Sequence, residues 1–346
     1  MVTRSREAIG AIITLNKLND DKNIKMSMQL KTCIEAAMAG GLVLKERLIG
    51  GMKARTKGDR DVGFHAIVTP ADFISQETIL SVLRKEDPNA YFITEEQVKS
   101  PRFIQRLVRP SNLELVRRNG VYIIDELDGS STYEKGHHEW SISVGYVDRK
   151  LVHTAGAIFA PDIRGGTLFF ASRGNGSFFA EMERTMIIDS SRNSDEPKID
   201  FRWNVRKAEV SKVSSIKNAY VIVGPDNFLS KYKVHSEALK ILGDNTRTMN
   251  GTGSCALSLG LVAAGKAEAV VQPVQSPWDW AAGKALVEEA GGVFRFYEML
   301  DGKIIPITNL RLEHYNPDKK AVGFVAGNKA ITDWIMDRFL EINRKV

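Results

Sequence analysis

The sequence predicts an α+β half followed by an α/β half. The first half opens with helical periodicity and continues with short β-rich runs, whereas the second alternates strands and helices. A polar, charged stretch at 181–217 lacks sustained periodicity and separates the two patterns. We therefore expect one half at residues 1–200 and the other at 201–346, each of ordinary domain size.

Two helices are expected at the start of the first half. Residues 26–52 carry apolar side chains at helical spacing, and residues 73–83 repeat that pattern after the turn residues Pro70 and Asp72. Short apolar, β-rich runs with turn residues between them follow, and we expect them to be strands of one sheet. These runs are residues 91–94, 121–125, 140–147 and 167–171.

The second half begins near Ala219, where the rhythm of the sequence changes. Short apolar runs alternate with longer helical patterns, and the last helical pattern stops at Gly291-Gly292. The expected order is strand 220–223, helix 229–242, helix 254–264, strand 267–272 and helix 281–290.

Composition indicates a soluble cytoplasmic protein. Of the 346 residues, 43% are hydrophobic and 26% are charged, which is ordinary for a globular chain. Cys33 and Cys255 are too few and too distant for a disulfide scaffold or a zinc motif, so a reducing compartment fits best. The apolar stretch Ala8 to Leu15 is flanked by charges and is predicted to be a helix, not a signal peptide. We expect no membrane partner, because no apolar window is long enough to span a bilayer.

A formal charge of +6 raises the question of nucleic-acid binding. The densest basic stretch is interleaved with acidic residues and carries no nucleic-acid motif, so we interpret it as a solvated loop and expect no nucleic-acid partner. Its basic residues are Arg202, Arg206, Lys207, Lys212 and Lys217.

The segment 121–131 carries the strongest chemical signal. An apolar strand runs directly into Asp125 and Asp128, which can both point into one cavity where the strand turns. The carbonyl of Leu127 lies between them as a third oxygen, and hard oxygen ligands suit magnesium. An Asx turn followed by a helix cap is the structural alternative.

The residues that follow suggest an anion site beside the metal site. Gly129 lets the backbone approach a ligand closely, and Ser130 and Ser131 supply hydroxyls. The amides of Gly129 and Ser130 would begin a helix, whose N-terminus favours a phosphate.

Further carboxylates lie at the ends of other elements. Glu95 and Glu96 follow the strand at 91–94, and Asp279 precedes the helix at 281–290. Asp279 and Asp72 could each be a helix N-cap. A capping carboxylate can still bind a metal through its other oxygen.

These segments resemble the inositol monophosphatase superfamily of lithium-sensitive, magnesium-dependent phosphatases, which includes fructose-bisphosphatases and 3'-phosphoadenosine nucleotide phosphatases. Two separated signatures carry the resemblance, which covers most of the chain. They are Asp125-Glu-Leu-Asp-Gly-Ser130, continued by Trp140-Ser-Ile-Ser-Val-Gly145, and Trp278-Asp279 through Glu289-Ala-Gly-Gly292. Supporting matches are Val68-Thr69 with Asp72, Gly253-Ser-Cys-Ala-Leu257 and Val325-Ala-Gly-Asn-Lys-Ala330.

The resemblance implies a layered αβαβα sandwich of the sugar-phosphatase type, a homodimer and hydrolysis of a small phosphate monoester by a metal-activated water. It implies two or three Mg²⁺ ions held by Glu95, Asp125, the Leu127 carbonyl, Asp128 and Asp279. Glu95 would also act in catalysis, and Asp72 and Ser130 would orient the attacking water. The implied substrate or phosphate residues are Gly129, Ser130, Ser131, Gly253, Ser254 and Gln272.

Four departures from the family pattern concern the substrate side and the metal loop. Glu126 replaces the usual proline and either tunes metal affinity or faces solvent. Thr94 replaces a glycine, and Gln272 stands where inositol phosphatases present an acid. The lead-in 250–253 lacks the common Arg-Ser pair. The specific substrate therefore stays open between inositol phosphate, fructose 1,6-bisphosphate and a 3'-phosphoadenosine nucleotide, with an inactive phosphate-binding regulatory protein as the rival from another class.

Three weaker signals favour structural roles. Adjacent His137 and His138 would point to opposite faces of a strand, which disfavours a shared metal. The sequence 174–176 is too short for a dinucleotide fingerprint and is predicted to be a turn. Of Trp278 and Trp280, at least one is expected to pack in the core.

Overall fold

The computed structural model describes residues 25–48, 55–56, 67–68, 70–96, 98, 100–187, 198–224, 233–316, 318 and 322–344. The helix expected at Ala8 to Leu15 lies outside the described residues. None of the described helices is both long enough and apolar enough to cross a membrane.

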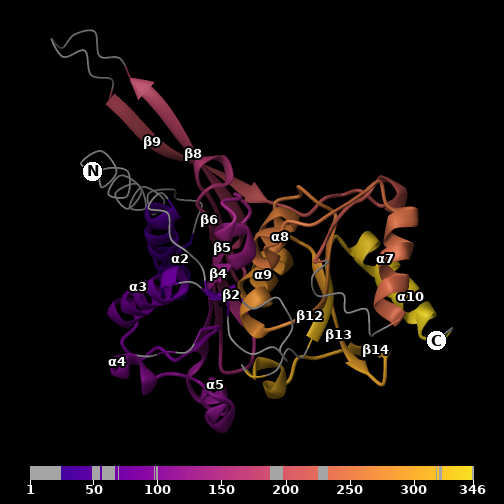
Figure 1. Ribbon diagram of the computed structural model, residues 1–346, viewed down its shortest axis with the longest axis horizontal. Coiled ribbons are helices and arrows are strands. Elements are labelled where there is room, and N and C mark those ends of the chain that lie inside the picture. Colours follow the sequence, from indigo (N-terminus) through magenta and orange to yellow (C-terminus); the bar gives the residue numbers. More distant parts are fainter. Residues whose placement is uncertain are drawn as a thin grey trace.

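The described chain forms five layers in the order helix, sheet, helix, sheet, helix (Figure 1). Helices α2 (Met28–Leu48) and α3 (Pro70–Glu86) cover the outer face of a seven-stranded sheet. Helices α8 (Cys255–Ala263) and α9 (Pro277–Glu289) lie between this sheet and a six-stranded sheet. The outer face of the second sheet is covered by α7 (Lys233–Asn245) and α10 (Lys329–Ile342). The expected αβαβα sandwich is confirmed.

The seven-stranded sheet follows the chain in simple order. Strands β3 and β4 are parallel, and each later pair is antiparallel. The expected strands at 91–94, 121–125, 140–147 and 167–171 are all present, whereas β6, β8 and β9 were not predicted. The strands are β3 (Phe92–Thr94), β4 (Val121–Asp128), β5 (Ser141–Val147), β6 (His153–Ala160), β7 (Thr167–Ser172), β8 (Gly176–Ile187) and β9 (Lys198–Ala208).

Strand β9 corrects the interpretation of the basic stretch at 202–217 as a solvated loop, because the first part of this stretch is a strand paired with β8. The two strands pair over their whole length and extend from the sheet as a long ribbon (Figure 1). Arg206 and Lys207 therefore lie on a strand, where Arg206 faces Glu181 with a nitrogen–oxygen distance of 3.9 Å. β9 also runs through the expected boundary between residues 200 and 201, and the second sheet begins at Tyr220. The division into two halves stays a prediction.

The six-stranded sheet has the order β11-β10-β12-β15-β13-β14. β10 is parallel to both of its neighbours, and the remaining pairs are antiparallel. The expected strands at 220–223 and 267–272 are present, and β11, β13, β14 and β15 were not predicted. The strands are β10 (Tyr220–Val223), β11 (Thr248–Asn250), β12 (Ala269–Gln275), β13 (Val293–Leu300), β14 (Lys303–Ile307) and β15 (Val322–Gly327).

Short elements complete the described chain. Strands β1 (Arg55–Thr56) and β2 (Ile67–Val68) pair antiparallel. The remaining α-helices are α4 (Pro101–Ile104), α5 (Leu115–Asn119) and α6 (Ser130–Glu134).

Helix α9 packs directly on the first sheet because glycines face it. A Cβ atom built on Gly156 would lie 2.6 Å from the carbonyl oxygen of Ala282, and one on Gly145 would lie 2.7 Å from the Ala282 amide nitrogen. Both distances are shorter than van der Waals contact, so only glycine permits this approach. The close packing holds the start of α9, and with it Asp279, beside β4 and β5.

Candidate active site

A β-bulge brings the two aspartates of β4 together. Asp125 pairs with Ser143 and Asp128 pairs with Ser141, so three steps along β4 match two steps along β5. Strict alternation would direct residues 125 and 128 to opposite faces, whereas the extra residue restores a common side. One carboxylate oxygen from each of Asp125, Asp128 and Asp279 lies within 4.8 Å of the others.

Asp128 is fixed by the N-terminus of α8. Its Oδ2 accepts hydrogen bonds from the Ser254 hydroxyl at 2.5 Å and the Ala256 amide at 2.6 Å. Its Oδ1 accepts from the Cys255 amide at 3.1 Å. These donors are the unpaired amides and the N-cap of α8, so a carboxylate from β4 closes the start of a helix on the other side of the site.

Asp279 lies in the first turn of α9, which begins at Pro277, four residues before the expected start. Ser276 is the N-cap, so the structural alternative in which Asp279 is the N-cap is wrong. Instead, Oδ2 of Asp279 accepts a hydrogen bond from the Ser276 amide at 2.7 Å. This bond orients the carboxylate from within the helix, because a third-position acid bonded back to the cap residue is a standard capping arrangement.

A second carboxylate group shares Asp125 with the first. Oxygens of Glu95, Asp125 and Glu126 also lie within 4.8 Å of one another. Glu126 is only 1% exposed, which rules out the solvent-facing alternative for this residue. Its Oε1 accepts from Nε2 of Gln76 at 2.8 Å, whereas its Oε2 is buried without a hydrogen-bond partner among the described residues.

Mutual repulsion among the clustered carboxylates favours a bound cation. Two unit charges 4.8 Å apart repel by about 3.5 kcal/mol at an effective dielectric constant of about 20. Burial, followed by the charge of Glu95, raises the pKa of Asp125 well above its ordinary value. Burial is also the main cause of the raised pKa of Asp128, which the hydrogen bonds from Ser254 and the α8 amides oppose.

The donor set fits a hard divalent ion. Among the described residues, neither Asp125, Glu126 nor Asp128 forms an ion pair with lysine or arginine. All the clustered side-chain ligands are oxygens, which magnesium and calcium prefer. The orphaned oxygen of Glu126 is a further sign that a positive partner belongs here.

The expected phosphate residues come together in two adjacent turns. Gly129 has a φ of 92°, and a Cβ there would lie 3.2 Å from the carbonyl oxygen of Gly253. Ser130 and Ser131 open α6 directly after it. The hydroxyl of Ser254 is bonded to Asp128, so this side chain supports a carboxylate in the structure.

Gln272 lies in β12, in the second sheet. It is buried, and its Oε1 accepts from Nε2 of Gln275 at 2.9 Å. A Cβ on Gly224 would lie 1.9 Å from that oxygen, so the Gln272 amide packs tightly against the end of β10. Its hydrogen bond to Gln275 was not foreseen.

Asp72 lies on α3 and Ser130 lies on α6. Asp72 is buried in the first turn of α3, two residues after its start at Pro70, so it is not the N-cap residue. The Ser130 hydroxyl donates to the carbonyl of Leu127 at 3.0 Å, which directs its lone pairs away from that carbonyl. The Leu127 carbonyl therefore lies beside the Ser130 hydroxyl.

Sequence reasoning missed Gln76 and Ser75, which hold the site from α3. Nε2 of Gln76 reaches both Glu126 and the Glu96 carbonyl, and the Ser75 hydroxyl donates to the Glu126 carbonyl at 2.8 Å. Both residues lie in the apolar stripe of α3 that includes Ile79. Polar residues at core positions of a helix are the signal that could have identified them.

The weaker signals have structural explanations. His137 and His138 are exposed in the connection between α6 and β5, not on a strand, and no candidate metal cluster among the described residues includes them. Residues 173–175 form the expected turn. Trp280 is fully buried and packs on His153, which confirms a core role.

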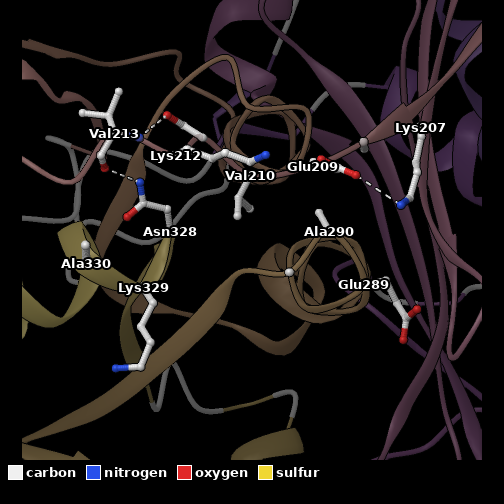
Figure 2. Close-up of a pocket in the computed structure, with 13 residues that line it drawn as sticks. Lys207, Glu209, Val210, Lys212, Val213, Glu289, Ala290, Asn328, Lys329 and Ala330 are labelled. Atoms are coloured by element: carbon white, nitrogen blue, oxygen red, sulfur yellow. Dashed lines mark hydrogen bonds and ion pairs between the residues drawn. The ribbon is translucent and has the colours of Figure 1, made fainter.

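A separate surface pocket of about 530 Å³ lies where β9, α9 and α10 meet (Figure 2). Asn328 donates to the Val213 carbonyl on one side, and Lys207 pairs with Glu209 on the other. None of the expected site residues lines it. The pocket and the carboxylate cluster are distinct features.

The layered αβαβα fold and the paired carboxylate groups define a class of α/β proteins with acidic sites that could hold metal ions. Residues 26–335 match the model of the inositol monophosphatase family. The chain therefore belongs to this family.

Relatives agree with this assignment over most of their length. The chain is 25% identical over 314 residues to the fructose-1,6-bisphosphatase/inositol-1-monophosphatase of Aquifex aeolicus, covering 89% of this chain and 94% of the relative. It is 28% identical over 287 residues to the Nus factor SuhB of Escherichia coli, covering 81% and 91%. Among solved structures, SuhB of Bartonella henselae matches with a TM-score of 0.64 at 23% identity, covering 91% and 99%, which supports the fold.

Proposed function

We propose that this chain is a magnesium-dependent phosphatase that hydrolyses a small phosphate monoester. The observation that carries the proposal is the pair of carboxylate groups that share Asp125, within the first family signature. Two adjacent cation positions that share a bridging acid are typical of sites for in-line phosphoryl displacement.

The chain's own residues would divide the work as follows. Asp125 would bridge the two positions, and Glu95 and Asp279 would complete one each. Asp128 would be held rigid by the start of α8. When bound, magnesium would neutralise phosphate charge and make a water molecule acidic enough to react. Two ions fit the two groups, and a third stays a prediction.

Asp72 and Ser130 are proposed to orient the attacking water. The hydrogen bond that Ser130 donates to the Leu127 carbonyl leaves the hydroxyl oxygen as an acceptor for a water proton. The turns at Gly129 and Gly253 are proposed to receive the phosphate, because they lie side by side and Gly129 offers its backbone without a side chain.

The proposed substrate class is a small phosphorylated alcohol, with inositol phosphate or fructose 1,6-bisphosphate as leading candidates. The name of the Aquifex aeolicus relative includes both activities. The neutral Gln272 disfavours strict preference for inositol phosphate, since an amide accepts hydroxyl hydrogen bonds less strongly than a carboxylate. A 3'-phosphoadenosine nucleotide is a further candidate.

A regulatory protein without turnover is the rival function, and the Escherichia coli relative is named as a Nus factor. Retention of Glu95, Asp125, Asp128 and Asp279 together favours an enzyme, because a binding role does not require this charge-rich arrangement. A cytoplasmic location and a homodimer stay predictions. Light scattering on the purified chain would test the homodimer.

The test is phosphate release from inositol 1-phosphate, fructose 1,6-bisphosphate and adenosine 3',5'-bisphosphate, with and without Mg²⁺. We expect magnesium-dependent release from at least one of them. Specific binding of these phosphates without any release would favour the regulatory alternative.

A further inference from the structure

Glu126 lies on β4 between two of the proposed metal ligands but has no role among them. It stands in β4 between Asp125 and the Leu127 carbonyl, and its side chain is 1% exposed. A buried carboxylate is rare unless it is paired or binds a metal.

One half of the Glu126 carboxylate is held in place. Oε1 accepts a hydrogen bond from Nε2 of Gln76, and the same nitrogen reaches the Glu96 carbonyl at 2.7 Å. The hydroxyl of Thr94 also donates to the Glu96 carbonyl, at 2.8 Å. One amide from α3 thus ties Glu126 to the loop that carries Glu95.

The second oxygen of the carboxylate, Oε2, is available to bind a cation. Oε2 is buried and has no hydrogen-bond partner among the described residues. An oxygen of Glu126 lies within 4.8 Å of oxygens of both Glu95 and Asp125. Oxygens bound to one octahedral magnesium ion at about 2.1 Å lie about 3.0 Å apart when cis and about 4.2 Å apart when trans, so these oxygens need to close by at most about 1.8 Å to share one coordination sphere.

We propose that Glu126 is an additional carboxylate ligand of the cation held by Glu95 and Asp125, and that it strengthens divalent-cation binding at this position. The inference rests on the proposed metal-dependent function. Gln76 is then a positioning residue, because it holds Oε1 and leaves Oε2 as the oxygen for the cation.

Glu126→Gln is a sharp test because the hydrogen bond to Gln76 dictates how the new amide lies. Gln76 donates, so the amide oxygen of the variant would take the place of Oε1 and the amide nitrogen that of Oε2. The cation would then face an N–H group in place of an anionic oxygen. Residues that only support metal ligands alter affinity by about tenfold to hundredfold, so a direct ligand should matter at least as much.

The experiment titrates EDTA-treated, dialysed protein with Mn²⁺ alone and with Mg²⁺ alone by isothermal calorimetry. Wild type is expected to bind two ions per chain. In Glu126→Gln the dissociation constant of one of these ions should rise at least about tenfold, while the dissociation constant of the other ion should stay the same as in wild type. The matched control is Glu268→Gln, because Glu268 is also buried but bonds the Tyr220 amide in the second sheet.

Thermal unfolding separates ligation from a structural role. A tenfold weaker ion stabilises the folded chain by about 1.4 kcal/mol less at the same excess of metal. The metal-free Glu126→Gln variant should melt at the same temperature as wild type or higher, since a buried charge has been removed. A variant that melts lower without metal and gains as much from metal as wild type would assign Glu126 a structural role and overturn the proposal.

The possible failures are distinguishable. If wild type binds neither ion, the proposed metal-dependent function fails. If wild type binds two ions and Glu126→Gln binds them with unchanged affinity, the function stands and the role of Glu126 is refuted. Gln76→Leu should weaken the same ion as Glu126→Gln, and an unchanged affinity would refute the positioning role of Gln76.

Discussion

Replacing Ser254 by alanine should impair stability and turnover while leaving phosphate affinity almost unchanged. The hydroxyl donates to Asp128 at 2.5 Å and accepts from the Leu257 amide at 3.2 Å, so it fixes a carboxylate and caps α8 at once. A direct phosphate ligand would show the opposite kinetic pattern, namely a raised KM.

The magnitude follows from the two bonds. Loss of a serine N-cap costs about 1 kcal/mol, and loss of a hydrogen bond to a charged group costs about 1.5–3 kcal/mol. Ser254→Ala should therefore destabilise the fold by about 2.5–4 kcal/mol. With an unfolding entropy of about 2.1 cal/mol/K per residue, the melting temperature of this 346-residue chain should fall by about 3–6 °C.

Calorimetric melting and steady-state phosphate release would measure the two effects. Ser258→Ala is the matched control, because Ser258 is equally buried on α8 but bonds the Ser254 carbonyl and Thr252 instead of Asp128. Its kcat should stay near wild type. If Ser254→Ala raises KM for the phosphate substrate more than tenfold at unchanged kcat and melting temperature, the supporting role is refuted.

Three further outcomes are expected. Asp72→Asn and Ser130→Ala should each slow turnover, and the double variant should be little slower than the slower single variant, because the two residues are proposed to orient the same water molecule. If the losses in kcat multiply in the double variant, the two residues have separate roles. Gln272→Glu should raise kcat/KM for inositol 1-phosphate relative to fructose 1,6-bisphosphate by about tenfold to hundredfold, which is the scale of a charge-assisted hydrogen bond. An unchanged ratio of the two kcat/KM values would show that Gln272 does not determine specificity. Burial raises the pKa of Asp125 above its ordinary 3.8, so the folded metal-free chain binds more protons than the unfolded chain and its stability should fall as pH rises from about 4. Melting curves in EDTA should show this fall, and Asp125→Asn should reduce it. Identical dependence of the melting temperature on pH in wild type and Asp125→Asn would contradict this expectation.

The layered fold was predictable where local pattern and burial agree. The run from Val121 into Asp125 is apolar until its end, and β4 is buried along its whole length. By contrast, the ribbon of β8 and β9 is rich in charged residues such as Glu183 and Arg202, which are exposed, so its sequence lacks the apolar signal of a core strand. The first part of β8 is buried, with Phe179 and Ala180 in the core, whereas pairing between the two strands accounts for the exposed part of the ribbon.

The residue types of the candidate site were predictable, but the hydrogen bonds that hold its carboxylates in place were not. Asp125 and Asp128 on β4 come together with Asp279 in the first turn of α9. The direction of Glu126 depends on Gln76, fifty residues earlier, and the hydroxyl of Ser254 is directed by Asp128 across the site. Such long-range bonds leave no periodic trace in a sequence, so only the folded arrangement could reveal them.

The most direct test of the proposed function is phosphate release by EDTA-treated wild type and Asp128→Asn, each assayed before and after Mg²⁺ is restored. We predict that wild type regains turnover of at least one small phosphate monoester with Mg²⁺. Asp128→Asn should remain slower by orders of magnitude although it is folded, as checked by circular dichroism. Turnover that survives chelation, or a folded Asp128→Asn enzyme with near-normal activity, would contradict the proposal that these carboxylates form the catalytic metal site.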